Sequence, residues 1–289
     1  MPEGHVIHRL ADELNLAFAG RAVAVTSPQG RFAPAAALLD GAVLRSAQAY
    51  GKHLLLDFSP STAPAAEPSL SPGSGLEGAG PFVHIHLGLI GKLRWVRPGR
   101  VEGPATLRLR LESPEHAAEL RGPQTCALIG AGEVRALVAG LGPDPLRPDA
   151  DPDLGWRRVH RSARTIASLL MDQRVAAGVG NIYRAEVLYR QRIHPDTPGN
   201  TLSLRAWRRI WADLVELMPQ GVRHGRIDTV RPEHSPEAMG RDPRVDRHGG
   251  EVYVYRRAGQ PCLVCGREVS VREFEGRNLY WCSRCQRRR

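Results

Sequence analysis

Four of the five cysteines form two pairs whose spacing suits a metal ion. Cys262 and Cys265 have two residues between them, as do Cys282 and Cys285, and 16 residues separate the pairs. Each short spacing lets two thiolates approach one ion from a tight turn, so two such turns can complete a tetrahedral zinc site. Four protein ligands leave no position for water, which predicts one structural zinc ion. Two disulfides or a redox site are the alternatives, and the absence of a secretion signal disfavours the disulfides.

The N-terminus carries a second chemical signal, which is weak by itself. Met1 is followed by Pro2, a small residue that favours removal of the initiator methionine, and then by Glu3. Without Met1, the secondary amine of Pro2 can attack a sugar carbon and form an iminium link. Glu3 beside it can carry a proton. Taken alone, such a short sequence is more often an ordinary chain start.

Two further segments could contact phosphate. Residues 178–181, Gly-Val-Gly-Asn, lie between two expected helices. The glycines allow a tight turn close to a phosphate, and Asn181 is placed to cap the next helix, whose N-terminus favours an anion. The same pattern is common in purely structural turns. Residues 275–278 occupy an expected hairpin turn in the cysteine module, where Arg277 is either a phosphate contact or a solvated side chain.

The elements that must position these residues fall into two groups. A helix is expected over residues 1–15 from its apolar spacing, and short strand-like runs follow, as in an all-β sandwich. The runs cover residues 22–26, 42–50, 53–58, 82–87, 92–96 and 106–111. Residues 59–80, rich in Ser, Pro, Ala and Gly, are interpreted as a flexible insertion, and residues 141–155, with four prolines, as a linker. Helices are then expected over 165–172, 182–191 and 204–218, and a β-hairpin near 269–274.

The positive charge lies after this linker. The chain has 289 residues and a net charge of +10, of which residues 1–155 carry −2, residues 156–245 carry +7 and residues 246–289 carry +5. Such a field attracts polyanions, and nucleic acid, an acidic membrane or an acidic protein would each fit the charge alone. No stretch approaches the roughly 18 apolar residues that cross a bilayer. No basic amphipathic helix with an aromatic face is visible either, which disfavours a membrane surface.

Six motifs in order along almost the whole chain resemble the formamidopyrimidine-DNA glycosylase and endonuclease VIII family of base-excision repair enzymes. They are MPEG at residues 1–4, GKHLLLDF at 51–58, HIHLGLIGKLR at 84–94, LGPDPL at 141–146, LLMDQRVAAGVGNIYRAEVL at 169–188, and YRRAGQPCLVCG with EGRNLYWCSRCQ near the C-terminus. The start, with His-Arg following, is most similar to the endonuclease VIII-like branch of actinobacteria.

The resemblance implies a multidomain α+β protein. Its parts are an N-terminal catalytic β-sandwich over residues 1–140 that contains the insertion 59–80, the linker 141–155, a helix–two-turn–helix DNA-binding domain over 156–245, and a zinc-finger β-hairpin module over 246–289. It implies double-stranded DNA with a damaged base or an abasic site as the partner, bound in the cleft between the domains. It also implies a monomer that needs no nucleotide cofactor and works in the bacterial cytoplasm at the nucleoid.

Individual residues also gain implied roles. Pro2 matches the Schiff-base nucleophile that attacks the sugar C1′, and Glu3 matches a general acid. Lys52 matches a lysine that serves catalysis and phosphate binding, and arginine could not replace it readily because arginine does not give up its proton. Asn181 and Arg277 match two phosphate ligands, and Arg277 is also assigned a part in δ-elimination.

Two less specific matches and two departures complete the comparison with the family. Glu186 falls on a glutamate that assists catalysis, and Leu89 falls where the family inserts a wedge into the gap left by a flipped base. Val6 stands where many members have a glutamate, so a proton relay through that position is unavailable. Gly88 stands where some endonuclease VIII members have a polar gap-filling residue, which leaves the lesion preference open.

The resulting hypothesis is a bifunctional DNA glycosylase and AP lyase of base-excision repair. It removes oxidised bases, with oxidised pyrimidines preferred, through a Pro2 Schiff base and β,δ-elimination. The same chemistry on oxidised purines such as 8-oxoguanine or formamidopyrimidine is one alternative. A non-catalytic DNA-binding protein is another. A ribosome-associated or RNA-binding zinc protein would explain the charge and the cysteines, but not the N-terminal motif.

Overall fold

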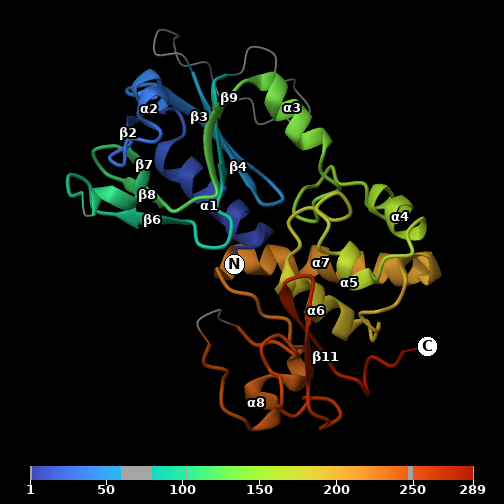
Figure 1. Ribbon diagram of the computed structural model, residues 1–289. Coiled ribbons are helices and arrows are strands. Elements are labelled where there is room, and N and C mark those ends of the chain that lie inside the picture. The colour runs from blue at the N-terminus through green and yellow to red at the C-terminus, as the bar shows by residue number, and fades with distance from the viewer. Residues whose placement is uncertain (1, 60–79, 102, 247–249, 289) are drawn as a thin grey trace. The chain divides into compact units, whose positions relative to one another are not determined.

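The structure is a computed structural model that describes residues 2–59, 80–101, 103–246 and 250–288. These residues cluster into two compact units, Met1–Gly140 and Leu141–Arg289. Figure 1 colours the first unit from blue to green and the second from yellow-green to red. The insertion expected over residues 59–80 lies, apart from its two end residues, outside the described residues. In the part of the chain that is described, no helix is long and apolar enough to cross a membrane.

Two antiparallel sheets form the framework of the first unit. One has the strand order β1-β3-β4-β5-β9, and the other has the order β2-β7-β8-β6. The strands are β1 (Arg21–Ala22), β2 (Ala24–Thr26), β3 (Val43–Tyr50), β4 (His53–Phe58), β5 (Phe82–His86), β6 (Lys92–Val96), β7 (Leu107–Glu112), β8 (Ala117–Arg121) and β9 (Thr125–Ile129).

Alternating side chains hold the two sheets together. In β7, Leu107, Leu109 and Leu111 are buried at a period of two, and Arg110 between them is also buried and forms an ion pair with Glu119. Buried residues of both sheets and of helix α1 (Gly4–Phe18) share one core. Helix α1 packs against β3 and β4 (Figure 1). The N-terminal β-sandwich expected from the sequence is therefore confirmed.

Three helical segments of the first unit were not expected from the sequence. They are α2 (Ala33–Leu39), the short 3₁₀ helix η1 (Pro104–Thr106) and α3 (Ala131–Ala139). Helix α3 contributes Val134 to a small separate core with Leu55 and Phe82 on the five-stranded sheet. One part of this sheet's second face is thus covered by α3.

The second unit is mainly helical and ends in a β-hairpin. Its elements are α4 (Pro152–His160), α5 (Ile166–Leu169), α6 (Asn181–Arg190), η2 (Gly199–Thr201), α7 (Leu204–His224), η3 (Pro232–His234), α8 (Pro236–Met239), β10 (Ser270–Phe274) and β11 (Arg277–Trp281). Tyr183 of α6, Trp207 of α7 and Leu279 of β11 belong to one hydrophobic core, together with Cys262 and Cys282. The helical segment and the cysteine module therefore share a core.

Part of the stretch expected as a linker packs inside this second unit. The N–H of Gly142 donates to the carbonyl of Gln173 at 2.9 Å, and Leu146 packs against the core. Helix α4 already begins at Pro152. Helix α7 also differs from expectation, because it continues through Pro219 to His224 instead of ending at residue 218.

Candidate functional site

The start of the chain is fixed by helix α1. Pro2 is half-buried, and Glu3, the residue before the helix, has extended backbone (φ −111°, ψ 176°) and is 1% exposed. Ile7, Leu10 and neighbouring apolar residues anchor the helix in the core. Burial, with His8 nearby, lowers the pKa of His5 to about 4, so this imidazole is neutral at neutral pH. Pro2 and Glu3 thus lie directly before a helix that is anchored in the core, and His5 in the first turn of that helix is buried and neutral.

Lys52 lies in the turn between β3 and β4, the two strands on which α1 packs. Gly51 before it has a positive φ of 59°, which favours glycine. His53 Nδ1 lies 2.9 Å from His84 Nε2, and the rings of His53 and His86 are 5.0 Å apart. Burial, together with the neighbouring histidines and Lys52, lowers the pKa of His53 to about 4. Lys52 is therefore the cation beside a row of neutral imidazoles.

Leu89 lies in the turn between β5 and β6 and is 69% exposed, and its neighbour Ile90 is 77% exposed. Glycines on either side permit this tight turn: Gly88 has a φ of 68°, and a Cβ on Gly91 would lie 2.2 Å from the carbonyl oxygen of Leu87. Two adjacent large apolar side chains are therefore exposed to solvent in this turn. Their exposure fits the wedge expected at Leu89.

Asn181 is the first residue of α6, and the capping position belongs to Gly180. The cap expected from the Asn181 side chain is therefore wrong. Its Nδ2 instead donates to the carbonyl of Asn278 at 3.0 Å, and its Oδ1 accepts from Arg184. The helix after the glycine-rich turn is in this way attached to the hairpin of the cysteine module.

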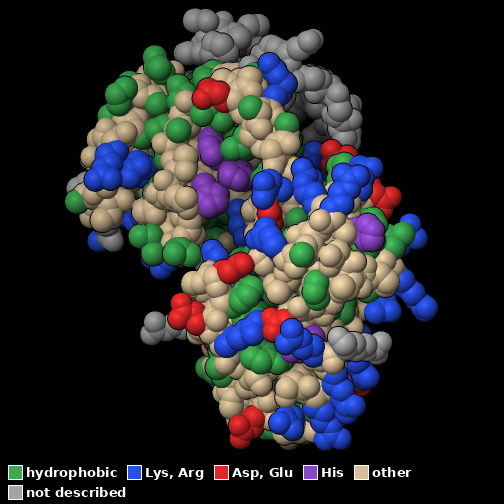
Figure 2. All heavy atoms as spheres, turned by 45° about the vertical axis from the view of Figure 1, so that its right-hand side comes forward, with side chains coloured by type: hydrophobic (Ala, Val, Ile, Leu, Met, Phe, Trp, Pro, Cys, Tyr) green, Lys and Arg blue, Asp and Glu red, His purple; other side chains and the backbone are tan. Residues whose placement is uncertain are grey.

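Arg277 begins strand β11 and is exposed. The preceding turn residues, Glu275 and Gly276, have φ values of 50° and 70°, as in a two-residue hairpin turn. Arg277 is next to Asn278, whose carbonyl Asn181 binds. The structure thus brings the two expected phosphate ligands of the second unit to one place, on a unit whose visible face carries many basic side chains (Figure 2).

Glu186 in α6 is fully buried and anchors another part of the chain. Its carboxylate accepts from the hydroxyl of Thr229 at 2.6 Å and from the backbone N–H of Tyr253 at 2.7 Å. It also accepts from the N–H groups of Val254 and Tyr255 at 2.9 and 2.8 Å. Four donors occupy a carboxylate away from solvent, so this geometry fits an anchor and not the catalytic helper that the resemblance implied.

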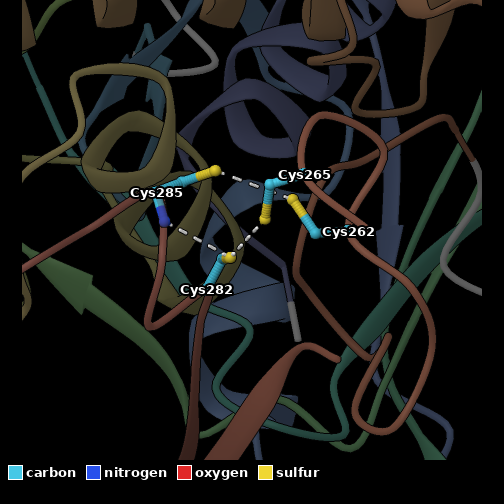
Figure 3. A group of neighbouring side chains, drawn as sticks. All are labelled: Cys262, Cys265, Cys282 and Cys285. Carbon is cyan, nitrogen blue, oxygen red and sulfur yellow. Dashed lines mark hydrogen bonds between the residues drawn. The ribbon is translucent and has the colours of Figure 1, made fainter. Parts of the chain in front are cut away.

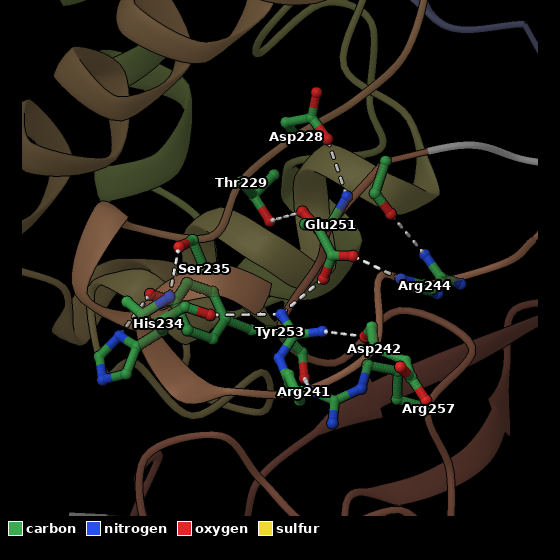
Figure 4. Close-up of polar contacts among 12 residues, drawn as sticks. Asp228, Thr229, His234, Ser235, Arg241, Asp242, Arg244, Glu251, Tyr253 and Arg257 are labelled. Carbon is green, nitrogen blue, oxygen red and sulfur yellow. Dashed lines mark hydrogen bonds and ion pairs between the residues drawn. The ribbon is translucent and has the colours of Figure 1, made fainter.

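Further hydrogen bonds hold the segment that Glu186 binds (Figure 4). The N–H of Glu251 donates to Asp228 Oδ1 at 2.8 Å, and the Glu251 carboxylate accepts from Arg241 Nη2 at 2.6 Å and from the N–H of Arg244 at 2.5 Å. The hydroxyl of Tyr253 accepts from the N–H of Arg231 at 3.0 Å. The chain that enters the cysteine module is therefore fixed by several hydrogen bonds in addition to those of Glu186.

The four paired cysteines converge on one point (Figure 3). Their sulfur atoms all lie within 4.8 Å of one another, with 3.8 Å between Cys262 and Cys285 and 3.5 Å between Cys265 and Cys282. A tetrahedral zinc site with Zn–S bonds of about 2.3 Å has sulfur atoms about 3.8 Å apart. These separations fit a zinc ion, and all four cysteines are free of disulfides.

The fifth cysteine behaves as expected for a packed side chain. Cys126 lies in β9 and packs against the core of the first unit. Burial raises the pKa of its thiol to about 12. A neutral, partly covered thiol is a poor nucleophile, so Cys126 contributes to packing and not to catalysis.

Known proteins match the whole chain. The formamidopyrimidine-DNA glycosylase N-terminal domain matches residues 1–126, the formamidopyrimidine-DNA glycosylase H2TH domain matches residues 141–231, and the zinc finger found in FPG and IleRS matches residues 259–288. Endonuclease 8 1 of Mycobacterium tuberculosis H37Rv is 46% identical over 293 residues, which cover 99% of this chain and 100% of that protein. The chain belongs to the formamidopyrimidine-DNA glycosylase and endonuclease VIII family.

Further comparisons agree with this family. The formamidopyrimidine-DNA glycosylase of Methylococcus capsulatus is 32% identical and covers 86% of this chain and 84% of its own. The crystal structure of the Lactococcus lactis glycosylase non-covalently bound to AP-site DNA has a TM-score of 0.73 at 20% identity, over 99% of this chain and 100% of that one. This likeness confirms the fold class, and the zinc-finger match together with the sulfur geometry assigns one structural zinc ion to the four cysteines.

The sequence did not predict the residues that form hydrogen bonds to the zinc site and to the hairpin turn. Tyr189 in α6 places its hydroxyl 3.0 Å from Cys262 Sγ and 3.9 Å from Cys285 Sγ. Ser168 in α5 donates to Glu275 in the hairpin turn at 2.6 Å. No local spacing signals these pairs, since their members are 73 to 107 residues apart. Lys92, at the start of β6, has no role that the structure explains.

Tyr189 provides a test of the zinc assignment. Replacing Tyr189 by Phe removes a hydroxyl that donates to a zinc-bound thiolate, and such outer-shell partners are typically worth about 10- to 100-fold in metal affinity. We therefore expect zinc to pass to a competing chelator at about tenfold lower chelator concentration. Tyr280→Phe is the control, because it removes a hydroxyl from the same core, where the partner is Asn278 at 3.4 Å. Equal zinc retention by the two variants would contradict the role of Tyr189.

Proposed function

We propose that this DNA glycosylase is bifunctional: it removes oxidised bases from double-stranded DNA, with oxidised pyrimidines preferred, and then cuts the strand. The observation that carries the proposal is the chain start, where Pro2 adjoins buried Glu3, the residue before a helix that is anchored in the core. The 46% identity to a protein named Endonuclease 8 1, against 32% to one named formamidopyrimidine-DNA glycosylase, supports the pyrimidine preference.

The terminal amine of Pro2 is the proposed nucleophile. Its nitrogen forms a bond to C1′ of the damaged nucleoside as the bond from C1′ to the base breaks, and the base leaves with the electron pair and takes up a proton. The amine gives up its own proton. Glu3 protonates the sugar oxygen O4′ as the ring opens, which leaves an iminium ion between Pro2 and C1′.

The iminium ion then drives strand cleavage without any oxidant or reductant. Its positive nitrogen acidifies C2′, so loss of a C2′ proton expels the oxygen on C3′ in β-elimination. Loss of a C4′ proton next expels the oxygen on C5′ in δ-elimination, to which Arg277 contributes through its hold on the neighbouring phosphate. Lys52, beside neutral imidazoles, serves phosphate binding and proton transfer.

DNA binding has to expose the target base before this chemistry begins. Turning a base out of the duplex costs a few kcal/mol and is cheapest for damaged or unpaired bases. Asn181 and Arg277 at the hairpin and Lys52 in the sandwich are the proposed phosphate contacts. Leu89, exposed in its turn, fills the vacated space as apolar wedges do in other DNA-kinking proteins.

The partner is double-stranded DNA that contains a damaged base or an abasic site. The positive charge of residues 156–289 supports this partner, as does the similarity to a glycosylase solved with AP-site DNA. We expect the protein to act as a monomer without a nucleotide cofactor, in the bacterial cytoplasm at the nucleoid.

Strand cleavage on a set of matched duplexes tests the proposal. Each duplex carries thymine glycol, 5-hydroxyuracil, 8-oxoguanine or an undamaged base at one position. We expect cleavage of both pyrimidine lesions at least about tenfold faster than cleavage of 8-oxoguanine, a difference in the range that pocket contacts supply. Faster cleavage of 8-oxoguanine would favour the purine alternative. Binding without cleavage of any duplex would favour a non-catalytic DNA-binding protein.

A further inference from the structure

Five charged or polar side chains connect α5 and the residues on either side of it to the hairpin turn. Ser168 Oγ donates to Glu275 Oε1 at 2.6 Å, and Arg164 Nη2 donates to Ser168 Oγ at 2.6 Å. Arg164 Nη1 also lies 3.4 Å from Asp172 Oδ2, which binds Arg174 Nη2 at 2.8 Å. Arg174 and burial act in opposite directions, and the net effect lowers the pKa of Asp172 to about 2. Asp172 is therefore ionised at neutral pH and holds Arg164 in place.

The direction of these hydrogen bonds is fixed by chemistry. A guanidinium only donates and an ionised carboxylate only accepts, whereas a hydroxyl has one proton to give. The single proton of Ser168 must therefore go to Glu275, and its lone pairs receive Arg164. The hydroxyl of Ser168, a residue that is 2% exposed, thus connects the Arg164 guanidinium to the Glu275 carboxylate. Hydrogen bonds in which one group is charged, as in both of these, are stronger than bonds between neutral groups.

The bridge through Ser168 ends at Glu275, two residues before Arg277. Glu275 is the first residue of the hairpin turn, with Gly276 second and Arg277 next. On the other side of Arg277, the carbonyl of Asn278 is held by Asn181 at 3.0 Å. Arg277 is therefore flanked by two points of attachment to the helices, one on α5 and one on α6. Its backbone is fixed while its side chain stays exposed.

We propose that Ser168 and Glu275 are positioning residues for Arg277: the bridge through Arg164 fastens the hairpin turn to α5 and so sets where the guanidinium meets a DNA phosphate. The inference rests on the proposed phosphate role of Arg277. Neither Ser168 nor Glu275 needs to touch DNA.

The bridge also keeps a negative charge away from Arg277. Glu275 precedes Arg277 by two residues, so a carboxylate released from Ser168 could pair with the Arg277 guanidinium and compete with phosphate. Bound to Ser168, the carboxylate instead stays at the hydroxyl that also accepts from Arg164. Loss of the bridge should therefore weaken binding to damaged DNA even though Arg277 itself is unchanged.

Four variants of the hairpin distinguish loss of the Ser168–Glu275 hydrogen bond, here called the tether, from loss of one negative charge. Glu273 is exposed in the neighbouring strand and serves as the matched control. Glu275→Gln removes the charge but keeps a carbonyl that accepts from Ser168, whereas Glu275→Ala removes the tether. Glu273→Gln and Glu273→Ala each remove one negative charge at another position of the hairpin. Affinity is measured for an undamaged duplex and for a duplex with a tetrahydrofuran abasic-site analogue, at several salt concentrations.

We expect all four variants to bind undamaged DNA equally or slightly more tightly, because each removes one negative charge. Glu275→Ala alone should lose preference for the abasic analogue, by about fivefold, a coupling typical of residues in one network. Ser168→Ala should lose at least as much, and Ser168→Thr, which keeps the hydroxyl, should recover most of it. In an Arg277→Ala background, the effect of Glu275→Ala should disappear.

Two results separate failure of the inference from failure of the proposed function. If Arg277→Ala weakens binding to the abasic analogue but Glu275→Ala behaves like Glu273→Ala, the positioning role is overturned and the phosphate role stands. If Arg277→Ala itself leaves affinity and its salt dependence unchanged, the phosphate role of Arg277 fails, and the positioning role with it. Thermal unfolding of each variant verifies that the unit remains folded.

Discussion

A chain in which Pro2 is replaced by leucine will form no covalent adduct with abasic-site DNA on addition of borohydride. Borohydride reduces an iminium ion to a stable amine, so trapping reports the Schiff base directly. Leucine is too large for efficient removal of Met1, and the retained methionine moves the terminal amine away from its place before α1. We expect strand cleavage to fall on the order of a thousandfold, as when the nucleophile of an enzyme is removed.

Pro2→Ala is the matched control for this experiment. Alanine is small enough for Met1 to be removed, and it leaves a primary amine at the same position, so trapping should persist. Mass spectrometry of both variants verifies the state of the N-terminus. The Pro2→Leu variant should still bind the tetrahydrofuran duplex within about twofold, since Pro2 is not a phosphate ligand. An adduct formed by Pro2→Leu would place the nucleophile elsewhere, with Lys52 as the first candidate.

Replacing Glu186 by glutamine should lower the free energy of unfolding of the second unit by about 3 kcal/mol or more. Four donors converge on the Glu186 carboxylate, three of them backbone N–H groups of residues 253–255. A glutamine of the same size presents an NH₂ group to some of these donors, which leaves buried N–H groups without an acceptor. Denaturant unfolding followed by circular dichroism measures the change.

Glu216→Gln on α7 is the control for Glu186→Gln. Its carboxylate is 59% exposed and lies 3.6 Å from Arg190, and surface pairs of this kind contribute about 0 to 1 kcal/mol. A catalytic role for Glu186 makes the opposite prediction, because Glu186→Gln would then keep its stability and lose base excision. A loss of stability below about 1 kcal/mol would therefore contradict the anchor.

The parts of the fold that follow from local periodicity were predictable. Strands β3 and β4 fall within the expected ranges, and helix α1 begins and ends three residues later than expected. The hairpin forms, but its second strand, β11, begins at Arg277, inside the turn expected over 275–278 and beyond the expected range 269–274. Strands β8 and β9 were missed. Their sequences, Ala-Ala-Glu-Leu-Arg and Thr-Cys-Ala-Leu-Ile, have little alternation, and each becomes a strand by pairing with β7 or β5. Strand formation there depends on partners more than on intrinsic preference.

The roles of some functional residues could likewise be predicted from the sequence, and those of others could not. The cysteines were predictable because two short spacings determine a metal site. The anchor role of Glu186 was not, because the N–H groups it binds are 67 to 69 residues further along the chain. For Asn181, the sequence indicated a cap, but a partner in the hairpin 97 residues away takes its amide. Roles that depend on distant partners require the folded structure.

The shared core of the second unit couples metal supply to the stability of the helices. Cys262 and Cys282 are buried in the same core as Trp207 and Tyr183, so the site cannot open without disturbing that packing. Zinc binding and cooperative melting of the whole unit are then one equilibrium. Each tenfold rise in free zinc above the dissociation constant adds about 1.4 kcal/mol to that equilibrium. A cell short of zinc would lose the helices that bear Asn181 together with the hairpin that bears Arg277.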